Sequence, residues 1–271
     1  MTDKAVILAR GLGTRMRKQS EADRALTPEQ AKIAETGVKA LVPIDRPFLD
    51  YVMTALADAG YRRICLVIGP EHDALREYYG KEIQAERLSF DFAVQAEPKG
   101  TADAVAAAET FAGDDPFLVI NSDNYYPLEA LRGLRELSGP GLAVFDRAAM
   151  FACSNVAADR ITKFAVVEQD GEGYLKRILE KPDADTVAAL PEPVGVSMNC
   201  WMFDQRIFEA ARMIAPSPRG EYELPDAVQT SIDKLGARYR VLTYEAPVLD
   251  LSSRDDVAGV AERLKGQEVR L

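Results

Sequence analysis

A glycine-rich turn directly after a short apolar run is the strongest chemical signal in this 271-residue sequence. Residues 5–9 (AVILA) have the length and uniform apolarity of a strand that is buried on both faces of a parallel sheet. Gly11 and Gly13 follow, and glycines this close together let backbone N–H groups approach a ligand without interference from a Cβ. The Thr14 hydroxyl and the Arg15 guanidinium add donors that suit phosphate oxygens. The turn predicts a phosphate-binding loop, while an ordinary strand-to-helix turn stays open as the alternative.

Two better-known phosphate loops are not supported by the neighbouring residues. The dinucleotide-binding pattern G-x-G-x-x-G needs a third glycine at the position of Met16. A Walker loop needs glycine, lysine and then serine or threonine, whereas Gly80 and Lys81 are followed by Glu82. What remains is a G-x-G-T-R-M turn, a polar loop over residues 18–37 with a helical turn after its proline, and then an apolar stretch that begins with lysine.

The stretches LARGLGTRM and KALVPI, at residues 8–16 and 39–44, resemble the signature of the sugar-phosphate nucleotidylyltransferases. Members of that family join a sugar 1-phosphate to an NTP and release pyrophosphate. The resemblance extends over nearly the whole chain, because other stretches similar to family motifs follow in order. It implies a single nucleotidyltransferase domain over residues 1–271, in which residues 1–150 mainly bind the nucleotide and residues 151–271 mainly bind the sugar.

Size and composition fit one α/β domain without a membrane span, since no apolar stretch approaches about 18 residues. The net charge is −10, from 33 Lys and Arg against 43 Asp and Glu, which argues against general binding to nucleic acid or to anionic membranes. Cys65, Cys153 and Cys200 are odd in number and widely separated, so we expect buried free thiols and a cytoplasmic protein. The sequence leaves the oligomeric state open, a homo-oligomer included.

Strands that alternate with helices predict an α/β fold with a Rossmann-like, mixed, mostly parallel sheet flanked by helices. Ligands of such a sheet collect at the carboxyl ends of its strands, so polar residues there are candidate site residues. A hairpin is expected over residues 161–182, with Asp170 and Gly171 in its turn. Further strands are expected at residues 64–69, 88–95, 116–124, 141–147, 194–203 and 239–251, and helices at 50–60, 71–79, 128–137, from 206, and 254–265.

Polar residues at the end of the expected strand 88–95 suit a nucleobase. Gln95 offers an amide donor and acceptor for a base edge, Gly100 lets a base lie against the backbone, and Thr101 is expected to cap the next helix. The resemblance makes these three residues, together with Leu8, part of the nucleotide-binding set. Without the resemblance, Gln95, Gly100 and Thr101 indicate only a polar strand end followed by the start of a helix.

Asp123 is the clearest single carboxylate, because it follows a fully apolar strand at the edge where phosphates held by the glycine turn would lie. Mg²⁺ takes one or two protein carboxylates and completes its shell with water and phosphate oxygens, so Asp123 is the first candidate metal ligand. Asp250, at the end of a late strand, resembles the family's second metal-binding aspartate. The alternatives are a turn-forming role for Asp123 and a capping role for Asp250.

Three more residues resemble the family's sugar-phosphate contacts. Glu180 and Lys181 precede a proline at a strand end, where they would bind a sugar hydroxyl and the phosphate; a solvated charge pair is the alternative. Asn199 stands where the family usually has glycine, and asparagine tolerates left-handed backbone. Asn199 also replaces the last glycine of a near match to the hydrolase motif G-x-S-x-G. Since His72 is the only histidine, no serine triad is expected.

The resemblance implies attack by a sugar 1-phosphate oxygen on the NTP α-phosphorus, in line with the departing pyrophosphate. This chemistry needs positioning and charge neutralisation more than acid–base catalysis, which a chain with one histidine can provide. Arg15 would neutralise the leaving pyrophosphate, Lys39 would lie near the α-phosphate, and Lys181 would anchor the sugar phosphate. Asp123 and Asp250 would share a Mg²⁺ ion.

Two other functions remain open at this point. A nucleotide-sugar glycosyltransferase of related fold would release NDP and would use an Asp-x-Asp motif, whereas only Asp123 is acidic here. A non-catalytic sugar-nucleotide sensor is also open, because Arg10 replaces the family's usual small residue and Val38 its usual proline. Neither the base nor the sugar is specified by the sequence.

Overall fold

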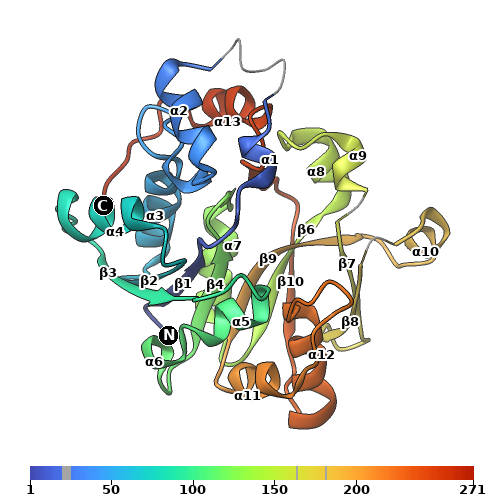
Figure 1. Ribbon diagram of the computed structural model, residues 1–271. Helices are drawn as coiled ribbons and strands as arrows, with labels where there is room; N and C mark the ends of the chain where they lie inside the picture. Colours follow the sequence, from blue (N-terminus) through green and yellow to red (C-terminus); the bar gives the residue numbers. More distant parts are fainter. Residues whose placement is uncertain (20–25, 163, 181) are drawn as a thin grey trace.

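The computed structural model describes residues 1–19, 26–162, 164–180 and 182–271, and this part of the chain is built around a nine-stranded sheet (Figure 1). Its main path runs β10-β6-β9-β4-β1-β2-β3, and β7 pairs with both β8 and β9. The main-path strands run parallel except β9, which is antiparallel to β4 and β6. The strands are β1 (Lys4–Leu8), β2 (Arg63–Ile68), β3 (Ser89–Val94), β4 (Phe117–Asn121), β6 (Gly141–Asp146), β7 (Val166–Gln169), β8 (Leu175–Leu179), β9 (Gly195–Phe203) and β10 (Arg240–Tyr244).

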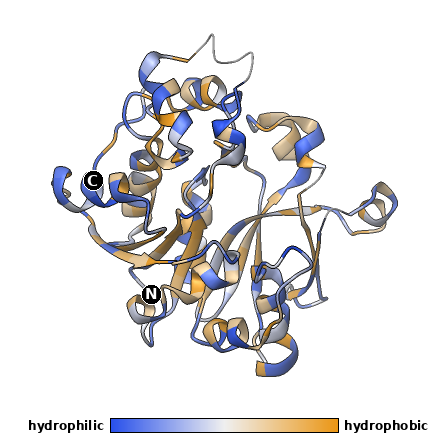
Figure 2. Ribbon diagram, in the orientation of Figure 1, coloured by the Kyte–Doolittle hydropathy of each residue, from blue (hydrophilic) through white to orange (hydrophobic). Residues whose placement is uncertain are grey.

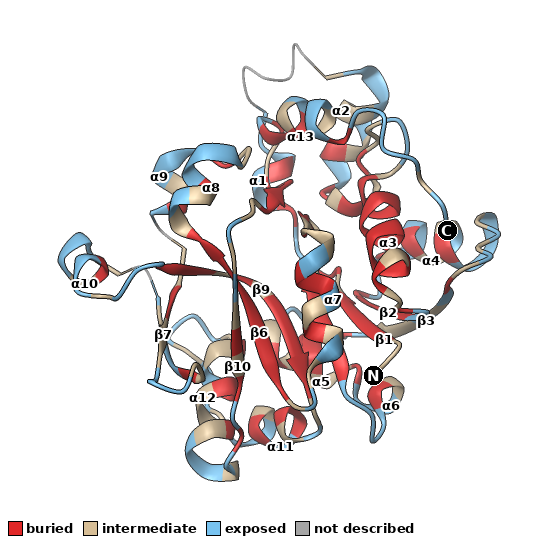
Figure 3. Ribbon diagram, turned by 180° about the vertical axis from the view of Figure 1, so that it is seen from behind, coloured by how far each residue is buried: buried red, intermediate tan, exposed pale blue. Residues whose placement is uncertain are grey.

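The helices cover both faces of this sheet, which confirms the predicted mixed α/β fold (Figure 3). Two short helical turns lie among these helices, a 3₁₀ turn (Lys39–Leu41) and a π turn (Tyr78–Glu82). The helices are α1 (Thr14–Arg17), α2 (Pro28–Thr36), α3 (Phe48–Ala59), α4 (Asp73–Glu77), α5 (Thr101–Ala106), α6 (Glu109–Ala112), α7 (Leu128–Glu136), α8 (Arg147–Cys153), α9 (Ala158–Ile161), α10 (Ala184–Ala188), α11 (Arg206–Met213), α12 (Leu224–Leu235) and α13 (Asp256–Leu264).

Strand β1 is buried on both faces, as its apolar run predicts. Ala5 and Ile7 belong to the core cluster that includes α3 and α7, whereas Val6 belongs to the opposite cluster, with α5, α11 and α12. This alternation follows from the two-residue period of a strand. Figure 2 shows the same concentration of apolar residues along the central strands. Because side chains pack against both faces of β1, the strand holds the start of the glycine turn in a defined position.

The late strand expected at residues 239–251 is wrong as a single element. It divides into β10, at the edge of the main sheet, and β11 (Leu249–Asp250), which pairs antiparallel with β5 (Asn124–Tyr125). Pro247 lies between the two strands and has no N–H for a ladder, so the chain leaves the main sheet there. The second pairing places the end of β11 beside the end of β4.

The expected loop over residues 18–37 contains a full helix in its described part. Helix α2 begins after Thr27, whose hydroxyl accepts from Gln30 N while the Gln30 side chain accepts from Thr27 N, a complete capping box. Residues 20–25 lie outside the described residues. The hairpin expected over residues 161–182 is confirmed by β7 and β8.

All three cysteines are free, but only Cys65 and Cys200 are buried. The expectation that Cys153 is buried is wrong, because α8 buries only Met150 and ends at Cys153. None of the described helices has the length and apolarity to cross a membrane.

Asn199 lies in a β-bulge of β9, where the pairing with β6 shifts between Ala143 and Val144. Its φ of 54° is the only positive value found among the described non-glycine residues, a backbone conformation that asparagine tolerates. The Tyr126 hydroxyl donates to Met198 O at 2.7 Å and fixes the bulge from below. The bulge turns Asn199 toward the cleft described below.

We expect Asn199→Val to lower the free energy of unfolding by about 1–3 kcal/mol, because a β-branched residue is strained at positive φ. Asn199→Gly, the matched control, relieves that constraint and should stay close to the wild type. Urea unfolding followed by Trp201 fluorescence measures both variants. Equal losses in the two would contradict a backbone origin of the effect.

Candidate active site

A cleft of about 410 Å³ opens beside the carboxyl ends of β1 and β4. This is the position at which parallel α/β sheets bind ligands, and the volume suits a small polar molecule. Residues from separate strand ends, from the glycine turn and from the Lys39 turn share its wall. The predicted site residues that line it are Leu8, Gly11, Thr14, Lys39, Gln95, Gly100, Thr101, Asp123 and Asn199.

Gly13 is needed for packing between two backbone segments. It has φ 61°, and a Cβ there would lie 2.1 Å from Gly37 O, so a side chain does not fit. Gly13 itself is not part of the cleft wall. The need for a glycine here is therefore better explained by packing against Gly37 than by binding of a phosphate. Gly11, by contrast, lines the cleft, and a Cβ added to it would have no protein atom within 4 Å. The contact with Gly37 brings the Lys39 turn beside the glycine turn.

Lys39 and Asp123 form an ion pair at the cleft wall, with 2.8 Å between Nζ and Oδ2. Their side chains are 16% and 21% exposed, so the pair is partly shielded from water. Ser122 N donates to Leu8 O at 3.2 Å, which ties the loop after β4 to the end of β1. An ammonium and a carboxylate in this position can bind a phosphate oxygen and a cation, respectively.

Asp250 lies next to Asp123, as the resemblance implies. Pairing of β11 with β5 sets Asp250 opposite Asn124, and Leu251 N donates to Asp123 O at 2.8 Å. Burial and the nearby Asp123 carboxylate raise the pKa of Asp250, and the Arg160 guanidinium lowers it. Asp250 is not part of the cleft wall, and its side chain is only 6% exposed.

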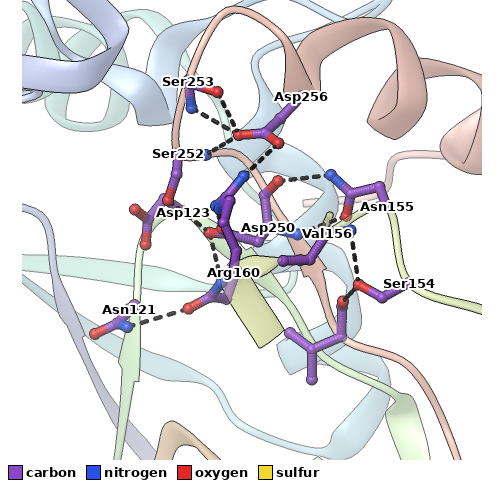
Figure 4. A network of polar contacts seen from close by, with 12 residues as sticks. Asn121, Asp123, Ser154, Asn155, Val156, Arg160, Asp250, Ser252, Ser253 and Asp256 are labelled. Atoms are coloured by element: carbon purple, nitrogen blue, oxygen red, sulfur yellow. Dashed lines mark hydrogen bonds and ion pairs between the residues drawn. The ribbon is translucent and has the colours of Figure 1, made fainter. Parts of the chain in front are cut away.

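Arg160 is a residue of this site that sequence reasoning missed (Figure 4). Its guanidinium contacts both Asp250 and Asp256, while Asp256 also accepts from the backbone N–H groups of Ser252 and Ser253. No motif marks Arg160, which lies in a short helix between two apolar stretches. The only hint in the sequence is its partner Asp256, because an aspartate at the start of the last helix can bind a cation or cap the helix.

Gln95 is oriented by two acceptors on α5 and just before it. Its Nε2 donates to Gly100 O at 3.0 Å and to Asp103 Oδ2 at 2.8 Å, which leaves Oε1 as the acceptor of this cleft-lining amide. Thr101 was expected to cap the helix that it begins, and this is wrong. Its hydroxyl accepts from Leu224 N at 2.9 Å, at the start of α12, because the 220–224 segment packs against it.

Several predicted residues lie outside the cleft wall. Arg15 is exposed on α1, and Glu180 is exposed at the end of β8, so neither lines the cleft. Lys181 lies outside the described residues. The roles assigned to these three stay predictions. The cleft also has lining residues that the sequence analysis did not select: Asn121, Ser122 and Glu221.

A nucleotidyl transferase family model matches residues 4–246. The chain belongs to this family. It is 29% identical to the low-salt glycan biosynthesis nucleotidyltransferase Agl11 of Haloferax volcanii, over 85% of this chain and 57% of that protein. It is 26% identical to the UTP–glucose-1-phosphate uridylyltransferase AglF of the same organism, over 97% of this chain and 96% of AglF. The chain thus spans little more than half of Agl11 but nearly all of AglF.

The fold is shared with solved structures. A UDP-glucose pyrophosphorylase complexed with UDP-glucose superimposes with a TM-score of 0.73 at 22% identity, over 99% of this chain and 100% of that chain. At this identity the likeness establishes the arrangement of the sheet and helices. The cleft of the present structure lies at the strand ends of that shared fold.

Two glycine variants separate packing from ligand contact. Gly13→Ala should destabilise the protein by about 1–3 kcal/mol, because its Cβ collides with the Gly37 backbone at a positive φ. Gly11→Ala should unfold at the wild-type urea concentration, because its Cβ meets no protein atom, yet weaken nucleotide binding by projecting from the cleft wall. Urea midpoints and nucleotide titrations measure the two effects. The assignment is wrong if Gly11→Ala is the less stable variant.

Proposed function

We propose that this protein joins an NTP to a sugar 1-phosphate and forms an NDP-sugar and pyrophosphate. The observation that carries the proposal is the Lys39–Asp123 ion pair, placed in the same cleft as the glycine turn. A cation for phosphate and a carboxylate for a metal ion are the groups that such a transfer requires. AglF, whose length the chain nearly matches, is named for this reaction with UTP.

The side chains around the cleft would act mainly by binding and orienting. The backbone at Gly11 and the Thr14 hydroxyl would bind the NTP phosphates, and Lys39 would neutralise charge near the α-phosphate. Arg15, exposed beside the turn, would reach the leaving pyrophosphate once the nucleotide is bound. We propose the sugar phosphate for the side of the cleft where Asn199 lies, with Glu180 and Lys181 as its further contacts.

Asp123 fits a Mg²⁺ ion. One of its oxygens, Oδ2, accepts from Lys39, and no group in the described part of the chain donates to Oδ1. A single accessible carboxylate is enough for an ion that takes most of its ligands from water and substrate phosphate. When bound, the ion would supply positive charge to the phosphate oxygens of the transition state. Asp250 is less suited to this ligand set, because its side chain is buried and its Oδ2 accepts from Arg160.

We also propose that residues 1–271 act as one domain, with residues 1–150 as the nucleotide side. Most of the cleft wall comes from those residues, whereas Asn199 and Glu221 come from the second part of the chain. A cytoplasmic location and a homo-oligomer stay predictions.

Replacing either of two charged groups should stop turnover without unfolding the protein. Asp123→Asn and Arg15→Ala should each lower pyrophosphate release by about 10²–10³-fold, because each removes a fixed charge that stabilises the transition state. Release is measured with Mg²⁺, UTP and glucose 1-phosphate in a coupled pyrophosphate assay. The matched controls are Asp233→Asn and Arg132→Ala, exposed residues on α12 and α7.

The same assay distinguishes the three functions. Near-normal turnover in Asp123→Asn or Arg15→Ala would refute the role assigned to that residue. Release of NDP from a nucleotide sugar would indicate a glycosyltransferase, and nucleotide-sugar binding without any turnover would indicate a sensor.

We propose UTP as the nucleotide, read in part by Gln95 through its Oε1, which can accept from the N3–H of uracil. Asp103→Leu removes one of the two acceptors that orient the Gln95 amide, so the preference for UTP should fall by about threefold to tenfold, the worth of one hydrogen bond. Asp103→Asn, which keeps an acceptor oxygen, should retain it. Thermal shifts with ATP, CTP, GTP and UTP measure the preference, since ligand binding raises the melting temperature. An unchanged ranking in Asp103→Leu would contradict this role.

A further inference from the structure

Arg160 lies between two buried carboxylates (Figure 4) and is not part of the cleft wall. Its Nη1 donates to Asp256 Oδ1 at 2.7 Å and its Nη2 donates to Asp250 Oδ2. The side chains of Asp250 and Asp256 are only 6% and 5% exposed, so water does little to screen their charges. A guanidinium stays protonated at all physiological pH values, so Arg160 is a permanent cation at this position.

Both oxygens of Asp250 are engaged by protein donors. Oδ1 accepts from Asn124 Nδ2 at 3.1 Å and from Ser252 Oγ at 2.9 Å, and Oδ2 accepts from Arg160. These donors come from three separate parts of the fold, which fixes the orientation of the carboxylate. Three of the roughly four acceptor positions of this buried carboxylate are therefore occupied by protein donors, which leaves Asp250 little capacity for a metal ion.

The two cations of the site differ in their freedom. Lys39 contacts one carboxylate, lines the cleft and carries a flexible side chain, so an arriving phosphate can draw it away from Asp123. Arg160 is not part of the cleft wall, and it divides its donors between two carboxylates. Moving Arg160 would take the counter-charge away from two buried carboxylates, which is strongly unfavourable.

We propose that Arg160 is a positioning residue that acts as the built-in counter-cation of Asp250, so that the divalent ion is bound by Asp123 and substrate oxygens alone. This inference rests on the proposed function for the nature of the ion and of the substrate. It departs from the two-aspartate ligand set that the family resemblance implies. The protein without nucleotide then binds a free divalent ion weakly, because of the two aspartates only Asp123 is available to it.

Removal of the guanidinium charge should create a metal site. In Arg160→Met, the carboxylates of Asp250 and Asp256 lose their counter-charge beside Asp123, and hard divalent cations bind clustered carboxylates. We expect the Kd for Mn²⁺ alone to fall by about tenfold or more, since one repelling charge is gone. Arg160→Lys, the matched control, keeps the positive charge and should stay within about threefold of the wild type.

The experiment titrates Mn²⁺ into the full chain without nucleotide and follows free Mn²⁺ by electron paramagnetic resonance. An unchanged or higher Kd in Arg160→Met overturns the proposal, provided that circular dichroism shows a folded protein. If that variant does not fold, the double variant Arg160→Met/Asp250→Asn decides, because it removes both charges of the pair and so keeps the net charge of the site. An unchanged Kd for Mn²⁺ supports the proposal, and an increase of about tenfold identifies Asp250 as a ligand and overturns it.

The Mn²⁺ titrations do not depend on whether the protein is catalytically active. A chain that releases no pyrophosphate would contradict the proposed function, yet its Mn²⁺ titration would still test the role of Arg160. Conversely, a normal reaction rate together with a metal-binding Asp250 would refute only the present inference.

Discussion

The site depends on the short antiparallel pairing of β5 with β11. These strands have two residues each, and they set the end of β4 beside a segment near the end of the chain. So short a ladder has few hydrogen bonds of its own, and its stability comes from burial. Leu249 and Leu251 lie in the same core cluster as Tyr126, and burying each leucine contributes roughly 1.5–3 kcal/mol. Packing of apolar neighbours therefore sets the spacing of the acidic residues.

That packing brings the carboxylates of Asp123, Asp250 and Asp256 together where water has limited access. Such a cluster is unfavourable unless cations lie close to it, since burying an unpaired charge costs several kcal/mol. The fold supplies two cations of different kinds. Lys39 belongs to the cleft and can exchange its carboxylate for a phosphate, whereas Arg160 belongs to the interior and connects α9 with α13 and β11. The site therefore combines an exchangeable charge with a structural one.

Much of the fold could be predicted from the sequence, because its strands are uninterrupted apolar runs and its turns carry glycine or proline. The positive φ of Asn199 agrees with the tolerance of asparagine for left-handed backbone, but the bulge around it was not predicted. The break between β10 and β11 was missed, although Pro247 marks it. The end of a strand is harder to predict from local patterns when apolar residues continue beyond it.

The candidate site was predicted where a residue carries its own signal, as the cleft-lining Lys39 and Asp123 do. Contacts between distant elements could not be predicted. Arg160 is a single arginine in a short helix, and only the tertiary structure shows that it pairs with Asp250 and Asp256. Gly13 illustrates another limit, because a glycine that binds a ligand and a glycine that packs against Gly37 look alike in a sequence.

The contact between Gly13 and Gly37 also affects how the chain can vary in evolution. Arg17 Nη2 donates to Thr36 O at 2.7 Å, so both boundaries of the intervening segment are joined directly. When the ends of a segment are already in contact, added residues increase the entropy cost of closure only slowly. Residues inserted between Arg17 and the start of α2 can therefore accumulate without displacing Lys39. This makes the segment a natural position for length differences among relatives, and for grafting a tag or a reporter.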